Sequence, residues 1–231
     1  MSHSDENKII DDIPVSEKIL RFRKSERSLH WALAVPFLVC MTTALVMVIV
    51  YNPDPQRPYR ALFSWTHRIS GMFLIFLPFA AVMKSRGDHR IYFYNIKQAW
   101  VWTIEDMRWL SLMGLAAVSK KFVLPEQGKF NAAEKINFMN LMATYPLYIL
   151  TGLLVWLTDV AFVSWVLHFL MAMIVVPLIA GHIYMALINP ASRIGLEGMV
   201  TGFVDRHWAK HHYGKWYREH YGDDRPPDSE R

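Results

Sequence analysis

The sequence predicts an all-α integral membrane protein built on a bundle of four transmembrane helices. Hydrophobic residues make up 53% of the 231 positions, and they are gathered in four long runs with the charged residues between them. A helix needs about 20 mainly apolar residues to cross about 30 Å of hydrocarbon, and each run is at least that long. The single cysteine, Cys40, lies inside one of these runs, so an intrachain disulfide and a thiol-based metal cluster are both excluded.

The four predicted helices follow from these runs in chain order. The first, Trp31–Val50, contains no charged residue. The second, about Phe63–Met83, is interrupted only by a His-Arg pair near its start. The third and fourth, about Ile136–Leu157 and about Ser164–Ile188, contain no Asp, Glu, Lys or Arg.

Lysine and arginine are distributed unevenly around these runs. Six precede His30, nine lie in the connection at about 84–135, and seven follow the fourth run, which together is 22 of the 25. The positive-inside rule then predicts that both termini are cytoplasmic. The chain divides into a cytoplasmic segment 1–29, a membrane domain 30–188 and a cytoplasmic tail 189–231. This topology also explains the net charge of +5, so no nucleic-acid partner is expected.

The long cytoplasmic connection contains a segment of intermediate polarity, Ala99–Val118. It is rich in tryptophan and methionine but carries scattered charges. Because its start is too polar to span the membrane, we expect an interfacial helix there.

Four of the ten histidines lie in the predicted spans, where ionisable side chains are costly and indicate function. Depth sorts them into two pairs. His30 and His182 lie near the cytoplasmic face, and His67 and His168 lie near the outer face. His168 and His182 are 14 residues apart on one helix. At about 100° and about 1.5 Å per residue they share nearly one face and lie about 21 Å apart.

Two neutral imidazoles on opposite sides of a flat macrocycle hold a low-spin b-type haem. The two pairs therefore predict two haem b groups between the helices, with these four histidines as ligands of the haem iron. Such a haem has no open coordination position, so it transfers electrons and does not activate a substrate. Gly71 and Gly181 would leave room for a porphyrin edge. Zinc is disfavoured because no thiolate or carboxylate lies at those depths to complete a site. A proton relay is also disfavoured, because it would normally include an intramembrane Asp or Glu and the predicted spans contain none.

Several motifs resemble those of a known family. They are SLHW at Ser28–Trp31, HRISG at His67–Gly71, GKFNAAEK at Gly128–Lys135, His168 with HIYM at His182–Met185, and RHWAKHHYGKWYRE at Arg206–Glu219. In this order, from about residue 25 to about residue 220, the chain resembles the gamma subunit of respiratory formate dehydrogenase. That subunit is a four-helix dihaem cytochrome b of the bacterial inner membrane.

The resemblance implies the same histidine pairing as depth does, with the pair His67 and His168 on the periplasmic side. It also implies a quinone, menaquinone or ubiquinone, beside the cytoplasmic haem, near Asn131, Ala133 and His182. The family has glycine where this chain has Ala133, which narrows that space. A role for Asn131 as a helix N-cap is an equally good interpretation.

The function implied by the resemblance is electron transfer between a periplasmic iron–sulfur subunit and a quinone on the cytoplasmic side. Substrate chemistry would belong to a catalytic subunit holding molybdenum or tungsten. Formate dehydrogenase is favoured, with the same role in a hydrogenase or thiosulfate reductase complex as an alternative, and a haem-free membrane anchor or assembly scaffold as another. The aromatic residues of the tail alternate with basic residues, which suits a lipid interface or a partner contact.

Overall fold

The structure is a computed structural model that describes residues 17–50, 58–85, 87–119, 121–158 and 161–222. Within these residues the chain is mostly helical, with a two-stranded sheet of β1 (Lys18–Leu20) and β2 (Phe203–Asp205). Residues 1–16 of the expected segment 1–29, and the end of the expected tail 189–231, lie outside the described residues.

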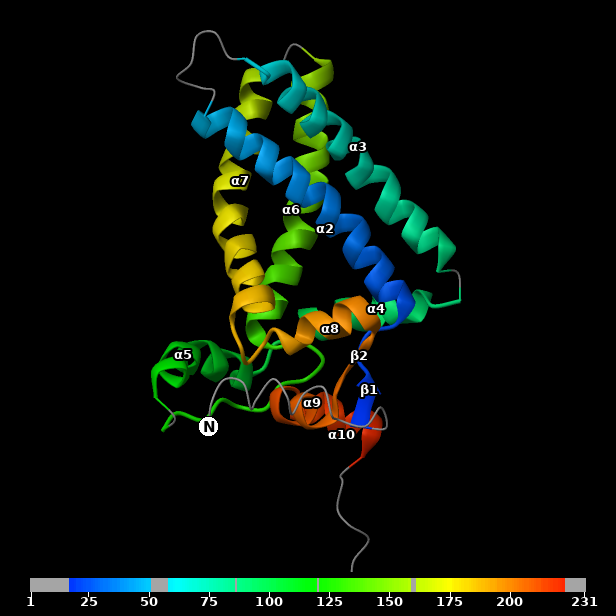
Figure 1. Cartoon of the computed structure of the whole chain (residues 1–231), viewed down its shortest axis with the longest axis vertical. Coiled ribbons are helices and arrows are strands. Elements are labelled where there is room, and N and C mark those ends of the chain that lie inside the picture. Colours follow the sequence, from blue (N-terminus) through cyan, green and yellow to red (C-terminus); the bar gives the residue numbers. More distant parts are fainter. Residues whose placement is uncertain (1–16, 51–57, 86, 120, 159–160, 223–231) are drawn as a thin grey trace, which may run out of the picture. The chain divides into compact units, whose positions relative to one another are not determined.

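Four helices are long and apolar enough to cross a membrane, which confirms that part of the predicted fold (Figure 1). They are α2 (Lys24–Leu45) with the π-helical turn η2 (Val46–Val50), α3 (Arg60–Lys84), α6 (Ala132–Leu157), and α7 (Ala161–Ile183) with the π-helical turn η3 (Tyr184–Ile188). Each begins a few residues before its apolar run, because the helical hydrogen bonds continue into the polar flanks. Each also contains one proline, which a membrane helix tolerates when neighbouring groups satisfy the freed carbonyl.

The chain forms two compact units. The first, here called the bundle unit, comprises Arg23–Tyr94 and Asn137–Met185. The second, here called the sheet unit, comprises Met1–Phe22, Asn95–Ile136 and Ala186–Arg231.

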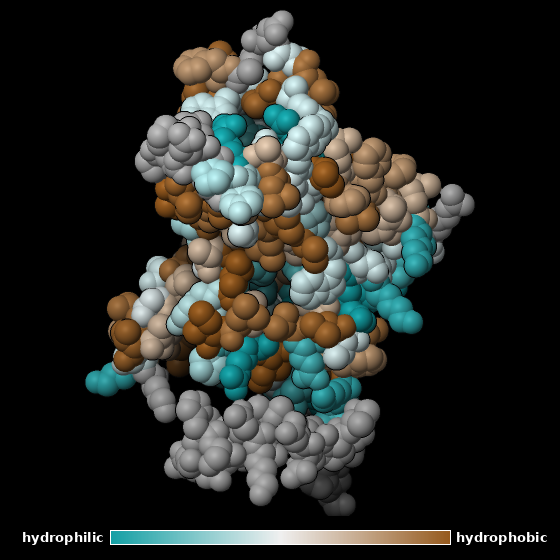
Figure 2. All heavy atoms as spheres, turned by 45° about the horizontal axis from the view of Figure 1, so that its top comes forward, coloured by the Kyte–Doolittle hydropathy of each residue, from teal (hydrophilic) through white to brown (hydrophobic). Residues whose placement is uncertain are grey.

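In the bundle unit α2 packs against α3, and the Tyr145 hydroxyl of α6 donates to the Leu74 carbonyl of α3 at 2.5 Å. Many large apolar side chains point outward, including Trp65, Phe76 and Phe79 on α3. Figure 2 shows apolar side chains exposed on the long helices. An apolar surface of this extent suits lipid, while the helical backbone satisfies its own polar groups.

Polar contacts tie the start of α2 to the residue before α4 (His89–Trp100). Asp88 accepts hydrogen bonds from Ser25 at 3.0 Å and from Arg23 at 2.9 Å. The hydrogen bond from Ser25, with that from Arg23, lowers the pKa of Asp88 below its usual value. This carboxylate therefore stays ionised and holds the two helix ends together.

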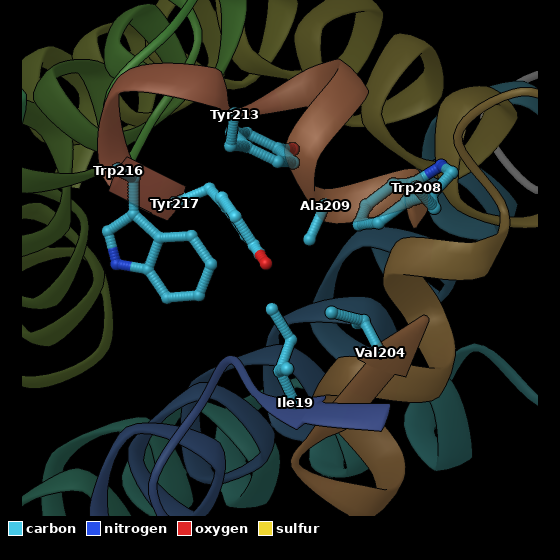
Figure 3. Packing of buried hydrophobic residues seen from close by; sticks show 7 residues of the cluster. All are labelled: Ile19, Val204, Trp208, Ala209, Tyr213, Trp216 and Tyr217. Atoms are coloured by element: carbon cyan, nitrogen blue, oxygen red, sulfur yellow. The ribbon is translucent and has the colours of Figure 1, made fainter. Parts of the chain in front are cut away.

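The sheet unit has its own core, formed where the antiparallel strands meet the C-terminal helices. Ile19 pairs with Val204 across the sheet. Helix α8 (Ile194–Thr201) precedes β2 in the chain, and α9 (Arg206–His212) and α10 (Gly214–Tyr221) follow β2. The buried cluster is drawn in Figure 3 and consists of Ile19, Val204, Trp208, Ala209, Tyr213, Trp216 and Tyr217.

This cluster corrects the expectation for the aromatic residues of the tail. Trp208, Tyr213, Trp216 and Tyr217 are buried within the sheet unit, so they are not available to a lipid surface or a partner. Cation–π contacts add to the packing, because the Arg21 guanidinium lies 3.9 Å from the Tyr213 ring centroid and 4.2 Å from that of Trp216.

The segment Ala99–Val118 contains the expected helix, although the helix begins later than the segment does. α4 ends at Trp100 and α5 (Ile104–Val118) begins after a break. The Asp106 carboxylate accepts from the backbone N–H of Thr103 at 2.7 Å, which completes a capping box at the start of α5. A capping box favours a new helix start over a continuous helix.

Candidate haem sites

The bundle unit brings the four histidines together as two pairs. The ring centroids of His67 on α3 and His168 on α7 lie 6.2 Å apart, with the rings inclined by 75°. Those of His30 on α2 and His182 on α7 lie 6.4 Å apart, inclined by 57°. Helix α7 thus contributes one imidazole to each pair, as its 14-residue spacing predicts.

These separations fit a metal held axially between two imidazoles. A metal–imidazole bond of about 2.0 Å, with the ring centroid about 1.1 Å behind the nitrogen, places opposed centroids about 6.2 Å apart. Both pairs lie within a tenth or two of an ångström of that value. Among the described residues no group of three or more His, Cys, Asp or Glu side chains gathers as metal ligands do. The assignment of the four histidines as haem ligands stays a prediction.

The tautomer of His67 is fixed by its neighbours on α2. Its Nδ1 lies 3.0 Å from the Cys40 carbonyl oxygen, which can only accept, so Nδ1 carries the proton. The same nitrogen lies 3.1 Å from Thr43 Oγ1. Because Nδ1 is protonated, the lone pair of the neutral ring is on Nε2, where iron would bind.

His168 has the same arrangement with α6. Its Nδ1 lies 2.9 Å from Thr151 Oγ1. The Thr151 hydroxyl donates its one hydrogen to the Leu147 carbonyl at 2.6 Å, so it accepts from Nδ1–H. The Nε2 lone pair of His168 is likewise left for a metal.

Open space lies beside two of the candidate ligands. A Cβ atom at Gly71 or at Gly181 would meet no neighbouring atom within 4 Å, and the place of these glycines beside a porphyrin stays a prediction. Gly152 is different, because a Cβ there would lie 3.5 Å from His168 Cε1. This short approach brings the Thr151 turn of α6 against the imidazole.

The pair His30 and His182 is held differently. In the part of the chain that the structure describes, neither ring has a hydrogen-bond partner of the kind found for the other pair. His30 contacts the Trp31 ring edge-on at 5.3 Å, and His182 is exposed. The two sites therefore differ in the contacts behind their ligands.

The predicted quinone residues lie at the start of α6, in the sheet unit. Asn131 Oδ1 accepts from the Glu134 backbone N–H at 2.9 Å, and Glu134 Oε2 accepts from the Asn131 backbone N–H at 2.8 Å. Asn131 is therefore an N-cap, one of the two roles expected for it, and its Nδ2 amino group is the part left to donate to a quinone carbonyl. Ala133 is half-buried in the first turn.

Glu134 is also tied to the aromatic core of the sheet unit. Its Oε1 accepts from the Tyr213 hydroxyl at 2.7 Å. Burial, with the nearby Glu134 carboxylate, raises the pKa of Tyr213 far above its usual value. The hydroxyl stays protonated and fixes Glu134, which in turn fixes the cap formed by Asn131.

Sequence reasoning missed Thr43 and Thr151. Both are almost fully buried, at 5% and 6% exposure, and both contact a candidate ligand. Hydroxyl residues in an apolar run are a weak signal, because such residues usually bond only to the carbonyl of their own preceding turn.

The comparison with known protein families gives an independent assignment. The model of the prokaryotic cytochrome b561 family matches residues 21–202. The chain belongs to this family. Membership of the cytochrome b561 family implies haem b, and with the four apolar helices it makes the chain a multi-pass protein of the bacterial inner membrane that serves electron transport.

Curated relatives of this cytochrome b561-family protein agree with the resemblance found in the sequence. The formate dehydrogenase cytochrome b556 subunit of Haemophilus influenzae is 26% identical over 90% of this chain and 86% of its own length. The nitrate-inducible formate dehydrogenase cytochrome b556(Fdn) subunit of Escherichia coli K12 is 26% identical over 88% and 92%. The cytochrome b556(fdo) subunit of the same organism is 24% identical over 88% and 93%.

Proposed function

We propose that this chain is the dihaem cytochrome b subunit of a membrane-bound respiratory oxidoreductase. The observation that carries the proposal is the presence of two imidazole pairs in one helical bundle, each at the centroid spacing of a bis-imidazole metal. When bound, a haem of this kind supplies reversible one-electron chemistry at an iron with no open coordination position.

The chain's own residues have distinct tasks in this proposal. His67 and His168 hold one haem, and His30 and His182 hold the other. The 14-residue spacing on α7 separates the two sites by about 21 Å along that helix at about 1.5 Å per residue.

The distribution of lysine and arginine supports an orientation with both termini in the cytoplasm. The pair His67 and His168 is then the periplasmic one. The relatives named as formate dehydrogenase subunits support a complex with a periplasmic iron–sulfur subunit and a catalytic subunit holding molybdenum or tungsten, with formate as the favoured substrate. Electrons would be exchanged with a quinone on the cytoplasmic side, where Asn131 and Ala133 are the proposed contacts.

The test is an optical difference spectrum of the purified protein, reduced with dithionite minus oxidised in air, with haem counted as the pyridine haemochrome. We expect two b-type haems per chain. His168→Ala should remove one haem and leave the other, and His30→Ala should remove the other. The double variant His168→Ala/His182→Ala should bind none, because α7 serves both sites.

Three outcomes would contradict the proposal. If His168→Ala and His30→Ala abolish the same single haem, the pairing is wrong. If the wild-type chain holds one haem, one of the pairs is not a site. If folded wild-type protein holds no haem, and all four histidines can be replaced without loss of partner activity, the chain is a membrane anchor or scaffold.

A further inference from the structure

We propose that Thr43 and Thr151 are positioning residues that fix the tautomer of His67 and His168 and lower the potential of the haem between them. The inference rests on the proposed haem sites and adds two residues that touch neither the iron nor a substrate. It concerns one of the two sites only, because the corresponding contacts were found only there within the described residues.

The geometry on the two sides of the site is the same. Each threonine lies on the helix preceding that of its histidine, Thr43 on α2 before α3 and Thr151 on α6 before α7. Each hydroxyl bonds back to the carbonyl four residues earlier, Thr43 to Val39 at 2.7 Å and Thr151 to Leu147 at 2.6 Å. The hydrogen of the hydroxyl is used in that bond, so the oxygen is left as an acceptor.

A hydrogen-bond acceptor at Nδ1 determines how the imidazole binds iron through Nε2. It keeps the proton on Nδ1, so Nε2 is free to bind, and it fixes the ring orientation. Sharing the Nδ1 proton also makes Nε2 a stronger electron donor. A stronger donor stabilises the ferric state over the ferrous state, so the midpoint potential falls.

Each imidazole also has a backbone partner on the helix that carries its threonine. His67 Nδ1 has a second acceptor in the Cys40 carbonyl at 3.0 Å. Loss of the Thr43 hydroxyl therefore leaves that proton bonded. The His168 ring likewise has a backbone hydrogen-bond partner, Tyr148, beside the Thr151 hydroxyl at 2.9 Å, so loss of either threonine hydroxyl weakens the hydrogen bonding of the ring without abolishing it.

These contacts also explain why hydroxyl residues occur at these depths. Both threonines are nearly buried, and a buried hydroxyl that bonds only to its own helix contributes little to packing. Accepting a hydrogen bond from the imidazole N–H is a role that explains a hydroxyl at this depth. Thr144 on α6 is a natural comparison, because it makes the same backbone bond, to the Asn140 carbonyl at 2.8 Å, two turns from Thr151.

The experiment is a redox titration of the purified full-length protein, with the spectrum followed as the potential is changed. The variant His168→Ala identifies which of the two midpoint potentials belongs to the His67–His168 site. We expect Thr151→Val to raise that potential and leave the other unchanged. Thr43→Val should raise it as well, and Thr151→Ser, which keeps the hydroxyl, should restore the wild-type value.

Two further measurements separate tuning from a packing defect. Thr144→Val, the matched control, should leave both potentials unchanged. The electron paramagnetic resonance spectrum of oxidised Thr151→Val should show altered g values for one low-spin haem, with two haems still present per chain.

The inference would be overturned by unchanged potentials in Thr151→Val and Thr43→Val, or by an equal shift in Thr144→Val. Each of these results is obtained in protein that still holds two haems, so the proposed function would stand. Absence of the second haem from the wild-type protein would instead refute the proposed function itself.

Discussion

The buried ion pair between Lys135 and Asp106 gives the sharpest prediction about the stability of the sheet unit. Lys135 Nζ lies 2.9 Å from both carboxylate oxygens of Asp106 and 2.9 Å from the Val101 carbonyl. The two side chains are only 9% and 5% exposed. The pair joins the start of α5 to the first turn of α6, next to the proposed quinone contacts.

Asp106→Asn removes the negative charge and leaves the ammonium of Lys135 buried. Removing one partner of a buried pair costs about 3–5 kcal/mol. We expect about 3 kcal/mol, the lower end, because the asparagine oxygen can still accept from the backbone N–H of Thr103 and keep the helix cap. The assay is urea unfolding in detergent followed by tryptophan fluorescence, with Trp102, whose ring lies 5.7 Å from Lys135 Nζ, as a nearby reporter.

Two variants make the test specific. Asp205→Asn is the matched control, because Asp205 also caps a helix of this unit, through Trp208 N–H at 2.6 Å. Asparagine caps as well as aspartate does, so this change should cost less than about 0.5 kcal/mol. The double variant Asp106→Asn/Lys135→Met removes both charges and should recover at least half of the loss. A free energy of unfolding for Asp106→Asn within about 1 kcal/mol of wild type, or no recovery in the double variant, would refute the reasoning.

Two further predictions concern the same unit. Asn131→Asp keeps the N-cap oxygen but loses the amino group that would donate to a quinone carbonyl. The quinone KM should therefore rise about tenfold, which is the effect of one hydrogen bond, while two haems are retained. An unchanged KM would exclude Asn131 as a donor to quinone. His212 stacks on Trp208 at 4.8 Å, and burial lowers its pKa below the usual 6.5, so the folded state binds this proton less readily than the unfolded state. The free energy of unfolding should therefore be highest above pH 6.5 and fall as the pH decreases below 6.5. In urea unfolding at pH 7.5 and 5.5, His212→Gln should reduce the difference between the two free energies of unfolding. The same difference in wild type and variant would contradict the prediction.

Features encoded by local periodicity could be predicted from the sequence. The four spans follow from apolar runs, and the common face of His168 and His182 follows from their spacing. The break before α5 is also local, since the T-x-x-D pattern of Thr103 and Asp106 is a capping signal. The cap places the start of α5 at Ile104, later than the start of the segment Ala99–Val118.

Features that depend on contacts distant in the chain could not be predicted. The pairing of Lys18–Leu20 with Phe203–Asp205 joins two three-residue strands, which are too short to show an alternating pattern. The tail aromatics looked like interface residues, because alternation with basic residues is the same whether a ring faces lipid or its own core. Their burial depends on β1, which lies about 190 residues earlier in the chain.

The histidine pairs show the same division between local and distant determinants. Periodicity places the imidazoles, but it does not determine which ring nitrogen carries the proton. That choice is made by acceptors on other helices, the Cys40 carbonyl and Thr43 for His67, and Thr151 for His168. A threonine that bonds back to its own helix has the same sequence signature with or without a histidine behind it, as Thr144 demonstrates. Candidate ligands can therefore be predicted from the sequence, whereas the hydrogen bonds that would set a ligand's donor strength require the packed helices.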